Sequence, residues 1–268
     1  MKPAILGIVN ITEDSFSDGG RFARAEDAIA HALRLREEGA DVIDLGAAAS
    51  NPAARAVSAG EETARLRPVI EALQAEGASV SVDSFATETQ RFALAAGADY
   101  LNDINGFADA DFYPELARGA ARLIVMHSVQ GRGPATREGA GLDGVSMVAR
   151  VVAFFEERLA ALRRAGVREE RLILDPGMGF FLGPESEASL EVLRELGRLR
   201  ERFSLPVLVS TSRKSFLRVV SGAPLERAGA ATLASELFSV VVGGADYVRT
   251  HEPRPLREAL AVWRALAS

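Results

Sequence analysis

The sequence predicts an α/β protein of the (β/α)8 class, a TIM barrel folded as a single domain over residues 1–268. Short apolar runs alternate with segments of helical periodicity, which is typical of a parallel sheet buried on both faces. Eight such runs occur, and the length is close to the roughly 250 residues of a barrel of this class. A doubly wound open sheet is the alternative, but no glycine-rich dinucleotide-binding motif follows the first run.

The predicted strands are apolar runs that end at or next to polar residues or glycine. In chain order they are Ala4–Val9, Val42–Leu45, Ser79–Val82, Tyr100–Ile104, Leu123–His127, Leu172–Leu174, Pro206–Val209 and Tyr247–Arg249. Three of them follow a Gly-Ala-Asp tripeptide, starting at Gly39, Gly97 and Gly244, whose glycine can end the preceding helix. Between strands, Ala25–Glu38 and Val148–Ala165 carry apolar stripes at helical spacing, so both are expected to be helices packed on the core.

The composition excludes several classes of protein. Hydrophobic residues make up 48% and charged residues 25%, as in folded globular domains. The absence of cysteine excludes a disulfide framework, and three histidines make a zinc cluster hard to assemble. The net charge of −6 arises from interspersed charges, which predicts no nucleic-acid partner. No apolar run approaches the roughly 20 residues that span a bilayer, and no signal-peptide pattern is present, so we expect no membrane partner and a cytoplasmic location.

Polar side chains lie at the carboxyl ends of nearly all predicted strands. In a barrel of parallel strands these ends gather at one mouth, where active sites are built. The candidates in chain order are Asn10, the segment Gly46–Pro52, Asp83, Asn102, Asp103, His127, Asp175, Ser212, Arg213, Lys214, Arg249 and His251. The sequence therefore predicts an active site at this mouth.

Two groups among these residues indicate ligands. Asp83, Asp175 and the Asn102 amide are suited to a heterocycle with several N–H donors and a ring acceptor. Arg249 and His251, with Asn10 on the neighbouring strand of a closed barrel, are suited to a phosphate or pyrophosphate.

Two further candidates are less specific. His127 follows an apolar strand and is interpreted as a structural residue. Lys214 could be a Schiff-base nucleophile, a phosphate contact or a hydrogen-bond donor to a ring, and the residue alone does not rank these roles.

The ordered set of motifs resembles dihydropteroate synthase, a folate-pathway enzyme with a pterin-binding (β/α)8 barrel. Any one motif would be weak, but together they run from near the first residue to the last strand. The matching segments are Gly7–Gly20 (GIVNITEDSFSDGG), Ser81–Ser84 (SVDS), Asn102–Ile104 (NDI), Met126–His127 (MH), Asp175–Phe180 (DPGMGF), Ser212–Phe216 (SRKSF) and Gly244–His251 (GADYVRTH).

The resemblance implies displacement of pyrophosphate from 6-hydroxymethyl-7,8-dihydropterin diphosphate by p-aminobenzoate, with Mg2+ as cofactor. It implies a pterin site formed by Asp83, Asn102, Met126, Asp175 and Lys214. Pyrophosphate would contact Asn10, Arg249 and His251, with Asn10 also touching Mg2+. The p-aminobenzoate site would comprise Ser50, Pro52, Phe180, Ser212 and Lys214. Of these, Asn10, Asp83, Lys214, Arg249 and His251 would be the catalytic set, and the chain would form a homodimer.

The sequence departs from the usual family pattern near the arylamine site. The segment Ala47–Ala53 (AAASNPA) replaces the usual GESTRPG, so Asn51 stands where an anion-binding arginine is common, and Arg55 is the candidate to compensate. Phe181-Leu182 replaces Gly-Lys, and Ser210 replaces Gly. These changes, with Glu13 in place of a common proline, resemble the sulfonamide-resistant branch of the family. The hypothesis is that Phe181 excludes the drug while p-aminobenzoate is still accepted.

Other functions remain open from the sequence. A pterin-dependent methyltransferase shares the barrel and the Asp/Asn contacts, but it has little use for an anion site at Arg249 and His251. An aldolase would use Lys214 as a Schiff base. A non-catalytic pterin-binding protein would bind the pterin without releasing pyrophosphate.

Overall fold

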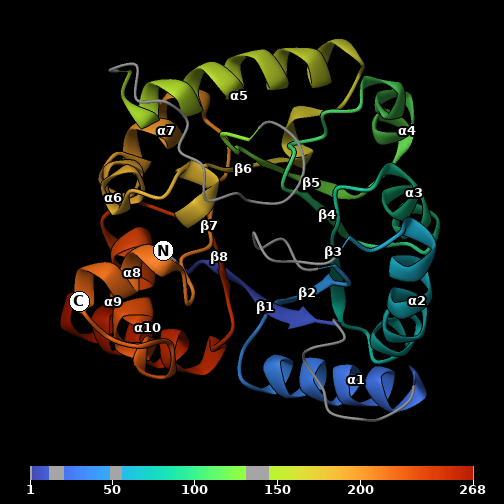
Figure 1. Cartoon of the computed structure of the whole chain (residues 1–268), viewed down its shortest axis with the longest axis horizontal. Coiled ribbons are helices and arrows are strands. Elements are labelled where there is room, and N and C mark those ends of the chain that lie inside the picture. Colours follow the sequence, from blue (N-terminus) through green and yellow to red (C-terminus); the bar gives the residue numbers. More distant parts are fainter. Residues whose placement is uncertain (1, 12–20, 49–55, 131–144, 268) are drawn as a thin grey trace.

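The structure is a computed structural model, and it describes residues 2–11, 21–48, 56–130 and 145–267 (Figure 1). The predicted p-aminobenzoate residues Ser50 and Pro52, and the substitution at Asn51 with its candidate compensator Arg55, lie outside these ranges. Within them, no helix is long and apolar enough to cross a membrane. The cytoplasmic location and the single domain over residues 1–268 stay predictions.

Eight parallel strands form the centre of the molecule. They are β1 (Ala4–Asn10), β2 (Val42–Gly46), β3 (Ser79–Asp83), β4 (Tyr100–Asp103), β5 (Arg122–Met126), β6 (Leu172–Asp175), β7 (Leu208–Val209) and β8 (Tyr247–Thr250). Their order is β6-β5-β4-β3-β2-β1-β8-β7, and a parallel bridge between Leu174 and Val207 joins the two ends. The predicted barrel is therefore confirmed. The strand β7 is shorter than predicted, because Pro206 has no N–H to donate to a ladder.

Helices surround the strands on all sides (Figure 1). They are α1 (Arg21–Glu37), α2 (Ala59–Ala75), α3 (Thr87–Ala95), α4 (Tyr113–Arg118), α5 (Met147–Arg164), α6 (Ser186–Arg194), α7 (Leu196–Phe203), α8 (Ser215–Ser221), α9 (Gly229–Val241) and α10 (Pro253–Ala267). The two helices predicted from apolar stripes correspond to α1 and α5, and their ends differ from the predictions by a few residues. A short 3-10 helix, η4 (Gly179–Leu182), follows β6.

Strand alternation divides the apolar residues between two cores. Every second residue of each strand packs outward against the helices, as Val80 and Val82 of β3 do. The opposite parity faces the barrel axis and forms a separate inner layer near the amino ends of the strands. This layer comprises Leu6, Val42, Ile124, Ile173, Leu208 and Tyr247. It fills the half of the barrel at the amino ends of the strands, so the inward positions nearer the carboxyl ends are free to form a site.

Candidate active site

The inward positions nearest the carboxyl ends of the strands are polar. Each lies two residues after an inward-facing residue nearer the amino end of the same strand, so strand alternation directs it to the barrel axis. These positions are Asp44 after Val42, Asp83 after Ser81, Asn102 after Tyr100, Asp175 after Ile173 and Arg249 after Tyr247. The register places Gly46 beside Asp83 and Asp83 beside Asn102. The structure thus brings together the residues predicted to bind a heterocycle.

Arg249 lies between two carboxylates. Its Nε donates to Oδ2 of Asp44 at 2.6 Å, and its Nη2 donates to Oδ2 of Asp83 at 2.7 Å. The sequence predicted instead that Arg249 would face an anion with Asn10 and His251. Strands β1 and β8 are neighbours, as that prediction required, and Asn10 is exposed at the end of β1. The guanidinium, however, is paired with the carboxylates, because their buried charges need a cation.

Asp44 was missed in the sequence interpretation. Its side chain is fully buried, and it lies inside β2 rather than at the end of the strand. The signal that could have found it is the period of two, since Asp44 and Gly46 share the inward face of β2.

Asp83 and Asp175 of this site have raised pKa values. Burial raises the pKa of Asp83 to about 7, although the neighbouring Arg249 opposes the shift. Burial likewise raises the pKa of Asp175 to about 6. The Gly177 N–H, which donates to Oδ1 at 2.8 Å, opposes this rise. Burial also lowers the pKa of Lys214 to about 8. The site therefore holds ionisable groups that titrate near neutrality, which is common where chemistry occurs.

Two buried acceptor atoms in the site lack a partner among the described residues. They are Oδ1 of Asn102 and Oδ1 of Asp44. An unpaired buried acceptor costs free energy, so such atoms in a native structure call for an explanation. A ligand carrying N–H donors would satisfy Asn102 from the barrel axis.

An aromatic and apolar cluster borders Lys214. Ile104, Met126 and Phe181 are buried together, with Phe85 and Phe180 packed against them. The Nζ atom of Lys214 lies 4.9 Å from the centre of the Phe181 ring, a cation–π contact. Gly179 has a φ of +65°, and a Cβ there would lie 3.4 Å from Cδ of Lys214. The predicted pterin and arylamine residues Met126, Phe180 and Lys214 are thus parts of one wall.

His251 pairs with Ser212. Their Nδ1 and Oγ atoms lie 2.9 Å apart, and the His251 N–H donates to the same oxygen at 3.2 Å. Burial, together with the nearby Arg213 and Arg249, lowers the pKa of His251 to about 3. The imidazole of the ligand-free protein is therefore neutral at physiological pH.

His127 has the structural role predicted for it. Its ring is buried, with Nδ1 3.2 Å from the Pro176 carbonyl oxygen and an edge contact to Phe154. Burial lowers its pKa to about 4.

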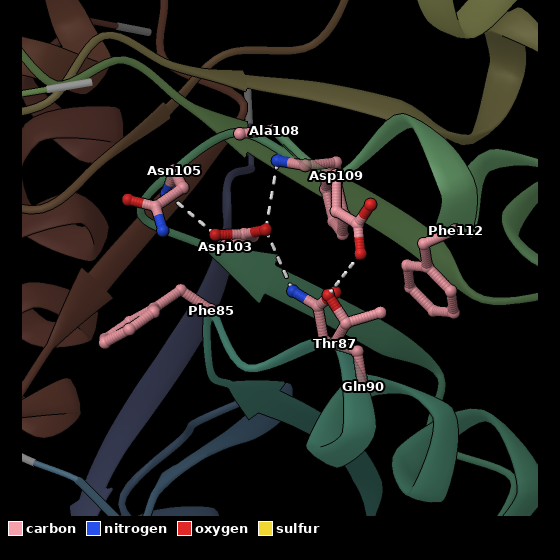
Figure 2. A pocket seen from close by; sticks show the side chains of 9 residues that line it. Phe85, Thr87, Gln90, Asp103, Asn105, Ala108, Asp109 and Phe112 are labelled. Carbon is pink, nitrogen blue, oxygen red and sulfur yellow. Dashed lines mark hydrogen bonds between the residues drawn. The ribbon is translucent and has the colours of Figure 1, made fainter. Parts of the chain in front are cut away.

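The prediction that Asp103 faces the active site beside Asn102 is wrong, because adjacent residues of a strand point to opposite faces and Asp103 faces away from the barrel axis. It accepts hydrogen bonds from the Gln90 side chain and from the N–H groups of Asn105 and Phe107. Figure 2 shows these contacts in a cavity of about 210 Å³ outside the barrel. Two adjacent residues of β4 thus face opposite sides: Asn102 belongs to the site, and Asp103 holds a loop.

The metal prediction rests on Asn10. Mg2+ commonly keeps several waters and binds substrate phosphates, so it needs only one or two protein oxygens. The exposed Asn10 amide at the mouth fits this requirement. Across the described ranges, His, Asp and Glu side chains form no cluster of three or more suited to a metal.

The comparisons with known proteins agree with this geometry. The family model described as pterin binding enzyme matches residues 6–251. A dihydropteroate synthase type-2 of Escherichia coli is 57% identical over 262 residues, covering 98% of this chain and 95% of the relative. The chain belongs to the dihydropteroate synthase family of pterin-binding enzymes.

Solved dihydropteroate synthases share the fold. The Xanthomonas albilineans enzyme with 4-aminobenzoic acid is 36% identical, with a TM-score of 0.88 over 100% of this chain and 94% of that one. The same enzyme with 7,8-dihydropteroate has a TM-score of 0.86 at the same identity and coverage. The resemblance inferred from the motifs is confirmed, and the chain is a transferase of the dihydropteroate synthase type.

Proposed function

We propose that this dihydropteroate synthase forms 7,8-dihydropteroate and pyrophosphate from 6-hydroxymethyl-7,8-dihydropterin diphosphate and p-aminobenzoate. The observation that carries this proposal is the group of Asp83, Asn102 and Asp175, of which Asn102 and Asp175 are buried and Asn102 has an unpaired acceptor. The ligands 4-aminobenzoic acid and 7,8-dihydropteroate in the Xanthomonas albilineans enzyme give further support.

The pterin ring is assigned to the barrel axis. Asp83 and Asp175 accept hydrogen bonds from ring and exocyclic N–H groups, and Asn102 offers a further acceptor. Lys214 donates a hydrogen bond to the pterin ring, because the contact with the Phe181 ring holds its ammonium group in position. Met126 covers the ring as part of the apolar wall.

The leaving group is assigned to Asn10, Arg249 and His251. The C–O bond to the methylene carbon breaks, the electron-rich dihydropterin stabilises the methylene cation, and the pyrophosphate departs with the bonding electrons. Electrostatic stabilisation of that anion by Arg249 is the largest expected contribution. Bound Mg2+, held through Asn10, would supply charge neutralisation of the phosphate oxygens.

The arylamine is assigned to the wall beside Phe180, Ser212 and the stem of Lys214, with Ser50 and Pro52 as further predicted contacts. The neutral amine forms the C–N bond and then loses a proton. Because an arylamine is nucleophilic when neutral, the site needs no strong general base.

The direct test is pyrophosphate release by the purified protein with Mg2+ and both substrates. Release that depends on p-aminobenzoate is the expected result. Binding of the pterin without release would indicate the non-catalytic alternative, and borohydride trapping of Lys214 with a carbonyl substrate would indicate an aldolase.

We also propose reduced sensitivity to sulfonamides. Phe181 is buried against Met126 and Ile104, and its ring contacts Lys214, so a bulky aromatic is fixed beside the arylamine wall. A drug whose sulfonyl substituent extends beyond the volume of p-aminobenzoate meets this wall, whereas the substrate does not.

Replacing Phe181 by glycine is expected to lower the inhibition constant of sulfamethoxazole about 10- to 100-fold, with a smaller change in the KM for p-aminobenzoate. Inhibition of pyrophosphate release measures both quantities. Phe155→Leu, a substitution of a buried aromatic on the outer face of the barrel, is the control. Equal changes in both constants in Phe181→Gly would contradict the proposed exclusion.

The predicted homodimer is also a proposal. A groove of about 350 Å³ lies between α6, α8 and α9, lined mainly by apolar side chains such as Leu193, Leu217 and Phe238. On α8, whose Val220 lines the groove, Val219 is 72% exposed, and Trp263 on α10 is 44% exposed. This apolar face fits a second copy of the chain. A mass near twice 28.5 kDa in sedimentation equilibrium is expected, and a monomer would contradict it.

A further inference from the structure

The two ion pairs of Arg249 differ in depth and in the nitrogen that they use. Asp44 has a fully buried side chain and receives Nε, the inner nitrogen of the guanidinium. Asp83 is 17% exposed and receives Nη2, a terminal nitrogen. Arg249 is therefore held at its base by one carboxylate and at its tip by another.

The tip of Arg249 lies where both halves of the proposed substrate must bind. Asp83 is assigned to N–H groups of the pterin, and Arg249 to the leaving pyrophosphate. While the pair between Nη2 and Asp83 persists, each group occupies hydrogen-bonding capacity that the substrate needs. This pair is also the more exposed of the two, so it is the one that a ligand can replace.

The pair at the base of Arg249 is the more deeply buried of the two. Among the described residues, Nε of Arg249 is the one donor to the Asp44 carboxylate, whose Oδ1 has no partner. Because Asp44 is fully buried, breaking this pair would leave an uncompensated charge without water. The pair between Asp44 and Arg249 is therefore expected to persist when the substrate binds.

We propose that Asp44 is a positioning residue for the transfer reaction. It holds Nε of Arg249 while the tip of the guanidinium moves from Asp83 to the diphosphate. Asp44 keeps Nε in place, and the Nη nitrogens exchange the Asp83 carboxylate for phosphate oxygens. Asp83 is then free to accept from the pterin. This inference rests on the proposed function, and it predicts that Asp44 matters for the phosphate half of the substrate rather than for the ring.

The test compares two ligands by calorimetry in the presence of Mg2+ and without p-aminobenzoate. One is 6-hydroxymethyl-7,8-dihydropterin diphosphate, and the other is the same alcohol without phosphates. In Asp44→Asn, the dissociation constant of the alcohol divided by that of the diphosphate is expected to fall about tenfold. This is the effect of misdirecting one hydrogen bond between charged groups. Removing a negative charge through space alone would change the ratio in the opposite direction, because the diphosphate would bind more tightly.

Ser81→Ala is the matched control. Ser81 is the register partner of Asp44 on β3, is equally buried, and makes no hydrogen bond to Arg249. The ratio of its two dissociation constants is expected to stay within about twofold of the wild-type ratio. The control thus separates loss of the Asp44 contact from a general disturbance of the barrel interior. An unchanged or larger ratio in Asp44→Asn, or an equal loss for both ligands, would overturn the proposal.

A second variant serves if Asp44→Asn does not fold. Arg249→Lys keeps the cation but lacks the fork that reaches both carboxylates, so it is expected to lose the phosphate preference as well. Retention of the full preference by Arg249→Lys would overturn the proposal. Failure of the proposed function itself would look different, because the wild-type protein would then release no pyrophosphate, whether or not it binds the diphosphate.

Discussion

Replacing Asp175 by asparagine is expected to lower kcat/KM for the dihydropterin diphosphate about 10²- to 10³-fold. The side chain is only 2% exposed and lies at the carboxyl end of β6. An asparagine presents an N–H₂ group to ligand N–H donors, so one acceptor is lost and a donor faces a donor. Loss of a hydrogen bond to a charged group costs about 1.5–3 kcal/mol, and an unpaired buried donor adds to it.

The pH dependence gives the same variant a second readout. Burial raises the pKa of Asp175 to about 6, so this group of the free wild-type protein is largely protonated below that value. Because the ionised form accepts from the pterin, kcat/KM of the wild type is expected to rise as the pH increases through this range. In Asp175→Asn the part of the rise that comes from this group disappears, whereas Asp83, whose pKa is raised to about 7, still contributes.

Asp99→Asn is the control for this experiment. Asp99 lies at the opposite end of the barrel, where its carboxylate accepts from the Val80 N–H at 2.9 Å. Its kcat/KM is expected to stay within about threefold of the wild type, since the site is remote. A folded Asp175→Asn with kcat/KM within tenfold of the wild type would contradict the assignment of Asp175 to the pterin.

Removing Arg249 is expected to reduce the free energy of unfolding by about 3–5 kcal/mol at pH 8, the cost of leaving buried charges without their partner. Arg249→Ala leaves both Asp44 and Asp83 without the cation that contacts them. The pKa of Asp83, which burial already raises to about 7, then rises further above its value in the unfolded chain. The contribution of Asp83 to stability is fully present below the pKa of the unfolded carboxyl and is lost as the pH rises through the raised folded value, so the deficit shrinks towards pH 5.

Urea unfolding of Arg249→Ala at pH 5 and pH 8 measures this effect. The double variant Asp44→Asn/Arg249→Ala is expected to recover at least half of the loss at pH 8, because the deepest charge is removed together with its partner. It also provides a folded sample if the single variant is too unstable to purify at that pH. A loss below about 1 kcal/mol at pH 8, or equal losses at both pH values, would contradict the buried-pair interpretation.

The sequence predicted the fold and the gathering of polar side chains at one end of the barrel, because both depend on local periodicity. Alternation of apolar runs with helical stripes is fixed by neighbouring residues, and polar residues that end parallel strands meet at one mouth. Asp83, Asn102, Asp175 and Lys214 could thus be assigned to one site without a structure. Asp44 follows the same alternation, but it lies inside a strand and not at its end.

The pairing and charge of the site depended on the tertiary structure. Arg249 and Asp44 are 205 residues apart in the chain and come from strands on either side of β1, so only the closed barrel brings them together. The neutral state of His251 and the raised pKa values of Asp83 and Asp175 depend on burial, which no single segment determines. The sequence by itself determined which residues reach the mouth, because strand alternation is local. The tertiary structure alone decided which of them pair and which carry charge, because desolvation and Coulomb interactions act between residues distant in sequence.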